Sequence, residues 1–150
     1  MLRSRPASAL TTLLLIASLL FLAAPSGNAQ DDDMAFPSDA LDWYLAGEAE
    51  RLWEHLGPMM RETPGGAAGL REGSAEIRAG LGAEISVIDE QVFPHPEDEA
   101  WSVYVRASRH ANAAEMFWIV VFLPSERQIE LIMPQPRQTI RTLFPAVRLP

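Results

Sequence analysis

The spacing of the hydrophobic residues changes abruptly at Gly82, and this change constrains the fold more than any other feature of the sequence. Before Gly82, hydrophobic residues recur three or four positions apart, as Leu41 and Tyr44 do, which is the spacing of a helix with one buried face. After Gly82 they recur at every second position, as Val103 and Val105 do, which is typical of strands. The sequence therefore predicts helices first and strands second, which is the order of an α+β domain.

Three helices are expected before Gly82. The first begins at Ser38, because serine is a good N-cap and the acidic residues that follow it suit the positive end of a helix. The second covers Glu48–Arg61, and Pro64 stops it. The third covers Leu70–Leu81, and Gly82 closes it as a C-cap.

Four strands are expected after the helices, at residues 84–93, 101–108, 115–123 and 128–133. The turns between them are short, so neighbouring strands should be antiparallel. The third strand is almost entirely apolar, which predicts a central strand buried on both faces. The expected fold is a curved four-stranded antiparallel sheet with the N-terminal helices packed on its concave face.

Residues 1–29 have the layout of a secretory signal peptide. Arg3 and Arg5 are followed by the uncharged run Leu10–Ala24, and Gly27 and Ala29 supply the small residues of a cleavage site. The run is shorter than the roughly 20 residues that a membrane-spanning helix needs. We therefore expect export by the general secretory route to the periplasm or the extracellular space. Intact mass of the secreted protein tests this, and a product that still carries Arg3 would contradict it.

The remaining chain divides into three parts. Residues 30–37 are an acidic start that is expected to be flexible, residues 38–136 form the folded domain, and residues 137–150 form a C-terminal tail with one apolar pair, Leu143 and Phe144. This domain is of ordinary single-domain size.

Charge and composition exclude several classes of partner. The net charge of the whole chain is −8, and loss of the two leader arginines makes it more negative by two. That charge argues against nucleic acid and, after cleavage, against anionic membrane surfaces. The chain has no cysteine, so no disulfide can stabilise an exported form.

Several short pieces of sequence occur in an informative order. These are Ala46-Gly47-Glu48, Leu52-Trp53, Pro58-Met59-Met60, Leu81-Gly82, Val103-Tyr104-Val105-Arg106 and the stretch from Ile129 to Pro134. In this order they resemble small exported bacterial domains of unknown function within the nuclear-transport-factor-2-like superfamily. The resemblance covers residues 38–136 and implies helices that fill the concave side of a curved sheet. The superfamily contains enzymes and non-enzymes, so the resemblance does not select a function.

No catalytic, metal or cofactor motif is visible. His55, His95 and His110 lack the spacing of metal ligands, and the chain has neither a cysteine nor a nucleophile elbow. We expect no metal, no cofactor and, as the favoured hypothesis, no catalytic residue. The favoured function is a non-catalytic exported domain that binds a small ligand or a partner protein.

A pocket in the concavity of the sheet is the expected binding site. Trp43, Trp53 and His55 would reach it from the helices and Trp118 from the sheet. The alternative hypothesis is a small lyase or isomerase of the polyketide-cyclase type, with His55 as general base. That alternative requires a carboxylate or a tyrosine within hydrogen-bond reach of His55, at the wall of an open cavity.

Tyr104 and Arg106 alternate with Val103 and Val105, so the two pairs must face opposite sides of the sheet. If the valines face the helices, Tyr104 and Arg106 lie on the outer face. We expect them there, in an interface of a homodimer formed through the sheet, since Tyr and Arg are enriched at interfaces. The second alternative places both in the pocket.

Overall fold

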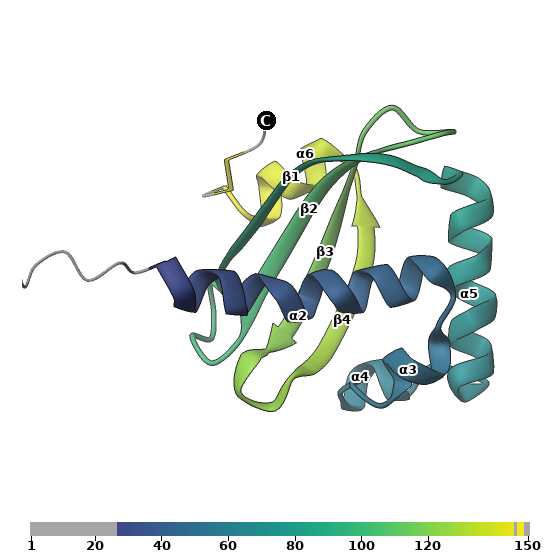
Figure 1. Ribbon diagram of the computed structural model, residues 1–150, viewed down its shortest axis with the longest axis horizontal. Coiled ribbons are helices and arrows are strands. Elements are labelled where there is room, and N and C mark those ends of the chain that lie inside the picture. The colour runs from purple at the N-terminus through teal and green to yellow at the C-terminus, as the bar shows by residue number, and fades with distance from the viewer. Residues whose placement is uncertain (1–26, 146, 149–150) are drawn as a thin grey trace, which may run out of the picture.

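The computed structural model describes residues 27–145, 147 and 148, and these form one antiparallel sheet with helices against both of its faces (Figure 1). Helices α2 (Gly27–Ala46), α3 (Ala49–Trp53), α4 (Pro58–Arg61) and α5 (Gly66–Leu81) precede strands β1 (Glu84–Pro94), β2 (Ser102–His110), β3 (Met116–Leu123) and β4 (Gln128–Gln135). The 3-10 helix η1 (Pro124–Glu126) joins β3 to β4, and helix α6 (Arg137–Leu143) follows the sheet. The predicted fold class is confirmed.

Helix α2 begins well before the predicted start at Ser38. It runs from Gly27 to Ala46 and contains Pro37, which cannot donate a backbone hydrogen bond and normally weakens a helix. Here Phe36 and Pro37 are both buried, with Phe36 only 4% exposed. Burial of these two side chains against the core stabilises α2, so the helix continues past Pro37. The folded domain therefore includes residues that we had assigned to a flexible start.

The predicted helix over residues 48–61 is divided in two. Pro58 forces Gly57 out of the helical conformation, to φ −77° and ψ 174°, so α3 ends at Trp53 and a new turn, α4, begins at Pro58. Between them, Leu56 forms a parallel bridge with Ile129 of β4. The backbone N–H of Gly57 donates to the carbonyl of Ile129 over 2.7 Å, so this break covers part of the β4 edge.

The strands follow one another in the order β1-β2-β3-β4, all antiparallel. The prediction of a central strand at 115–123 is confirmed, because β3 lies between β2 and β4 and is buried on both faces. Strand β4 continues through Pro134, which an edge strand tolerates because one side of it needs no ladder hydrogen bonds.

The C-terminal segment is more than a tail. Residues 137–143 form α6, which packs on the face of the sheet opposite α2. Ile140 is fully buried and Phe144 is 9% exposed, whereas Leu143 of the predicted apolar pair is 51% exposed. The i, i+4 spacing of Ile140 and Phe144 after a proline was the local signal for this helix. Two hydrophobic clusters result, one on each face of the sheet.

Most of the predicted leader, residues 1–26, lies outside the described residues, and residues 27–29 form the first turn of α2. Within the part of the chain that the structure describes, no helix combines the length and hydropathy that a membrane crossing requires.

Candidate functional site

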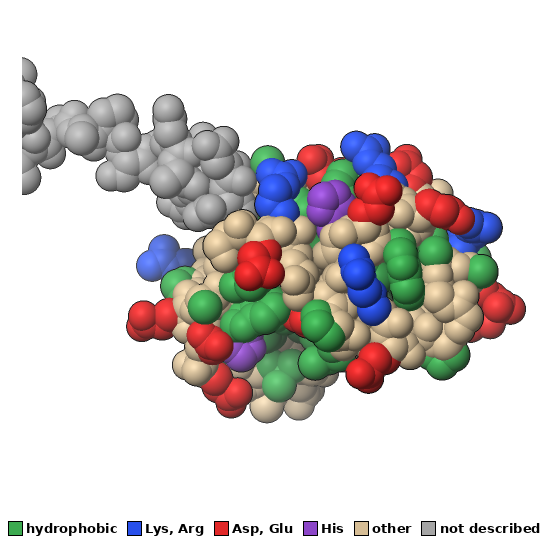
Figure 2. All heavy atoms as spheres, turned by 90° about the horizontal axis from the view of Figure 1, so that it is seen from below, with side chains coloured by type: hydrophobic (Ala, Val, Ile, Leu, Met, Phe, Trp, Pro, Cys, Tyr) green, Lys and Arg blue, Asp and Glu red, His purple; other side chains and the backbone are tan. Residues whose placement is uncertain are grey.

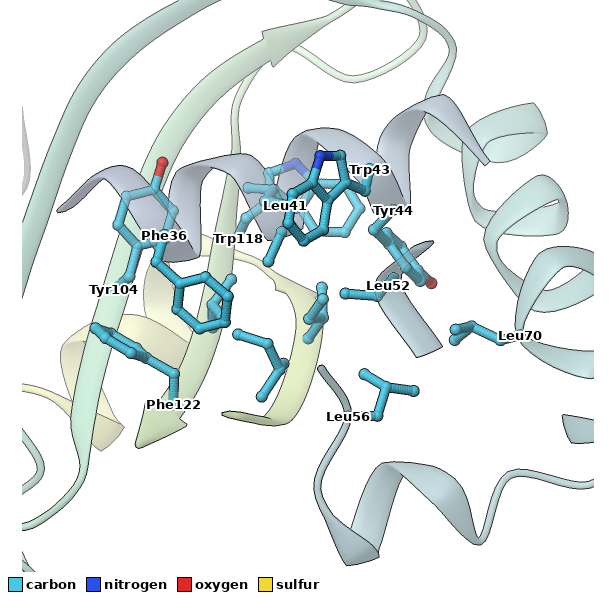
Figure 3. Close-up of a cluster of buried hydrophobic side chains, with 14 of the residues drawn as sticks. Phe36, Leu41, Trp43, Tyr44, Leu52, Leu56, Leu70, Tyr104, Trp118 and Phe122 are labelled. Carbon is cyan, nitrogen blue, oxygen red and sulfur yellow. The ribbon is translucent and has the colours of Figure 1, made fainter. Parts of the chain in front are cut away.

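The expected pocket over the sheet is filled with side chains. The larger hydrophobic cluster lies between α2 and the sheet, and Tyr104, Trp118 and Phe122 enter it from the strands (Figure 3). Trp118 and Tyr104 are both fully buried. Trp118 therefore belongs to the core and does not line an open cavity. The prediction placed it on the correct face of the sheet, and the packing of α2 removed the space in front of it.

Trp43 and His55 do come together. Their rings stack with centroids 5.3 Å apart, and the edge of Phe36 meets the His55 ring at 5.4 Å. Trp53 lies elsewhere, half-buried against the core and beside Gly66 at the start of α5. The structure thus joins two of the four predicted pocket residues and separates the other two.

His55 lies at the wall of an open hollow of about 470 Å³. The hollow is lined by Glu54, His55, Leu56, Pro58, Arg61, Glu126, Arg127 and Gln128. The His55 ring makes its hydrogen bond with the backbone carbonyl of Arg127, where Nδ1 and the oxygen are 3.3 Å apart. A carbonyl orients an imidazole but does not strengthen it as a base in the way that a carboxylate would.

Tyr104 and Arg106 face α2, which corrects the expectation that they point to an outer surface. Val103 and Val105 face the other way and are covered by Ile140 of α6. Arg106 is only 3% exposed and Tyr104 is fully buried. Because α2 and α6 cover the two faces, neither side chain is available to a sheet-to-sheet dimer interface.

The Arg106 cluster joins α2 to β1 and β2. Arg106 donates to Asp42 Oδ1 at 2.7 Å and to Ser38 Oγ at 2.7 Å, both on α2. Its Nε donates to Glu90 Oε1 at 3.2 Å and to the Tyr104 hydroxyl at 2.8 Å. Tyr104 in turn donates to Glu90. Charged hydrogen bonds of this kind are stronger than neutral ones, so the cluster fixes α2 on the sheet.

The same contacts shift the ionisation of both side chains. Burial, reinforced by the hydrogen bond to Glu90, raises the pKa of Tyr104 far above its ordinary value of 10.0. Burial by itself would lower the pKa of the Arg106 guanidinium, but the bonds and charges of Asp42 and Tyr104 outweigh burial and raise it. Burial also raises the pKa of Tyr44. These shifts belong to a structural cluster, and a tyrosine held protonated cannot act as a base.

Alkaline pH should destabilise the fold through its two tyrosines. The folded chain retains phenolic protons that the unfolded chain releases near pH 10, so the free energy of unfolding falls as pH rises above about 10. Urea unfolding between about pH 8 and pH 11 measures this. Tyr104→Phe should make the decline shallower. Tyrosinate absorbance that rises near pH 10 while the protein stays folded would contradict the prediction.

His110 is a second buried polar residue, and its role was not predicted. Its Nε2 accepts the indole N–H of Trp118 at 3.1 Å and contacts Ser108 Oγ at 3.0 Å, while Nδ1 meets the carbonyl of Gly82 at 3.2 Å. An indole N–H is only a donor, so Nε2 must be the acceptor and Nδ1 must carry the proton. His110 therefore ties the end of α5 to the core. Its alternation with Ser108 was the only local signal.

A second hollow, of about 620 Å³, lies beside the β1–β2 turn. Its lining consists of Pro58, Met59, His95, Glu97, Asp98, Trp101, Val121 and Glu130. Pro58 lines both hollows, so they share a wall at α4. Figure 2 shows the molecule from the side on which α4 lies in Figure 1, and hydrophobic side chains are exposed there among acidic, arginine and histidine side chains. We name it the Trp101 hollow. Sequence reasoning missed it because its lining comes from four separate segments.

Among the described residues, no three His, Asp or Glu side chains are placed to hold a metal ion. No family model, no curated protein and no solved structure matches this chain.

Proposed function

We propose that this chain is an exported, non-catalytic domain of the periplasm or extracellular space that binds a small ligand in the Trp101 hollow. One observation carries the proposal: the face that we expected to form a pocket is packed solid, whereas an open hollow lined by the Trp101 indole lies at the α4 end of the sheet. A volume of about 620 Å³ is within the range of small-ligand sites. The resemblance to the nuclear-transport-factor-2-like superfamily is compatible with this proposal, because that fold supports binding proteins as well as enzymes.

The lining of the Trp101 hollow supports a binding role. Trp101, Val121 and Met59 supply apolar surface, and Met59 is 65% exposed. A large apolar side chain left open to water beside an indole ring favours a ligand that would cover both. His95 and three carboxylates supply the polar groups that orient a ligand in such sites.

The alternative, a lyase or isomerase with His55 as base, has weaker support. His55 does line an open hollow, but its hydrogen-bond partner is the carbonyl of Arg127 and not a carboxylate or a tyrosine. Tyr104 and Arg106, which the second alternative placed in the pocket, are buried under α2. The proposed function therefore stays with binding.

Binding at the Trp101 hollow can be tested with a small-molecule fragment screen followed by nuclear magnetic resonance. Fragments that bind should shift the indole N–H signal of Trp101, and Trp101→Ala should weaken them roughly tenfold because an aromatic anchor is lost. Ile85→Ala is the control, since Ile85 is 63% exposed on β1 and does not line the hollow. Fragments that shift only His55, or no binding at all, would contradict the proposal.

A further inference from the structure

The two hollows at the α4 end differ in charge. The His55 hollow contains Arg61 and Arg127 together with two glutamates, so its charges balance. The Trp101 hollow contains Glu97, Asp98 and Glu130, and no arginine lines it. The chain has no lysine, so no ammonium group can neutralise these carboxylates from within the hollow. Its electrostatic potential is therefore negative and favours a cation.

Two of the three acidic groups, Glu130 and Asp98, are held in place by hydrogen bonds. Glu130 Oε2 accepts the backbone N–H of Met59 at 3.1 Å, and its Oε1 accepts the side-chain amide of Gln128 at 3.2 Å. Asp98 Oδ1 accepts the N–H of Ala100 at 3.0 Å. Each of these two carboxylates has lone pairs left for a ligand while its position is fixed. A ligand thus meets hydrogen-bond acceptors that are already oriented, so its binding loses little side-chain entropy.

The apolar part of the lining determines which kind of cation fits. Trp is the best aromatic partner for an organic cation, because the ring carries partial negative charge on its face. The polarisable thioether of Met59 and the side chain of Val121 add surface for carbon groups. A hydrated metal ion would gain no binding free energy from this apolar surface. An ammonium group attached to an apolar body would contact both the carboxylates and the apolar side chains of the hollow.

We propose that the Trp101 hollow binds a small organic cation, an ammonium group joined to an apolar body. This inference rests on the proposed function and gives its ligand a chemical class. Met59 and Val121 contact the apolar body, the ring of Trp101 contacts the ammonium group, and Glu130, Glu97 and Asp98 surround the charge. Glu130 is the best-positioned of the three carboxylates, because both of its oxygens accept hydrogen bonds, one from the backbone N–H of Met59 and one from the side-chain amide of Gln128.

Benzylammonium and benzyl alcohol form a matched pair of probes, because they share size and apolar body and differ in charge. Titrations at low salt, followed by the Trp101 indole signal, should give benzylammonium roughly tenfold higher affinity, from cation–π attraction and exposed ion pairs together. Added salt should reduce that difference, since exposed charges are screened.

Glu130→Gln should reduce the preference for benzylammonium about threefold and leave the affinity for benzyl alcohol unchanged. Glu97→Gln, at an exposed position, is the second variant in case the first one disturbs the fold. Glu126→Gln is the matched control, because Glu126 lines the other hollow. Equal affinity for the two probes would contradict the proposed preference for a cation but would still support ligand binding in the Trp101 hollow. Failure of both probes and of all fragments to bind would overturn the proposed function itself.

Discussion

Replacing Arg106 with methionine should lower the free energy of unfolding by about 3–5 kcal/mol, because partners of a buried charge are left unpaired. Arg106 is the only cation within reach of Asp42, Glu84 and Glu90 among the ion pairs of the described residues, and its side chain is 4% exposed. One oxygen of Glu84 is already buried without a hydrogen-bond partner. Without the guanidinium, the three carboxylates would repel one another under α2. Asp42 is 59% exposed and partly hydrated, which favours the lower end of the range.

Urea unfolding followed by circular dichroism measures this loss. Arg109→Met is the matched control, because Arg109 lies on the same strand and is exposed, so its loss should change stability by no more than about 0.5 kcal/mol. If Arg106→Met costs less than about 1 kcal/mol, the cluster does not hold α2 on the sheet.

Trp118→Ala should cost about 3–5 kcal/mol, because it removes the largest fully buried side chain from the core. Trp118 packs edge-on against Tyr44 of α2, with ring centroids 6.0 Å apart. The substitution also removes the indole N–H that donates a hydrogen bond to His110 Nε2, with the two nitrogens 3.1 Å apart. Phe122→Ala, on the same strand and 1% exposed, should fall in the same range.

Trp118→Phe separates packing from hydrogen bonding, because it keeps a ring and removes only the indole N–H and part of the volume. It should cost about 1–3 kcal/mol, since His110 loses one hydrogen bond. Leu143→Ala is the control, at a residue that is 51% exposed on α6. The free energy of unfolding, obtained from denaturant midpoints, is the quantity to compare. A loss of less than about 1 kcal/mol for both Trp118→Ala and Phe122→Ala would mean that β3 is not a central strand.

The sequence alone was sufficient to predict the type and order of the main helices and strands. The spacing of hydrophobic residues reflects local geometry, 3.6 residues per turn in a helix and two per repeat in a strand, so it can be read without the fold. The end of α5 at Leu81 was also predictable, since Gly82 has φ +74°, a conformation that favours glycine. The split of residues 48–61 had a local signal in Pro58, which we did not use.

The candidate site was predicted less well, because a pocket depends on what fills the space between elements. His55 lines a hollow, and Trp43 stacks on the His55 ring without lining that hollow itself, whereas Trp118 is part of the core. The Trp101 hollow could not be predicted from the sequence. Its lining comes from α4, the β1–β2 turn, β3 and β4, and no local pattern connects these segments.

Alternation along β2 determined that Tyr104 and Arg106 share one face and that Val103 and Val105 share the other. Only the tertiary structure decided which face meets which helix. Period two relates neighbours on one strand but carries no information about distant elements. Here α6 buries the valines, and Ser38 and Asp42 of α2 supply the polar partners that let Arg106 be buried on the opposite face. A buried charge depends on partners far away in the sequence, so its place is determined by the assembled fold.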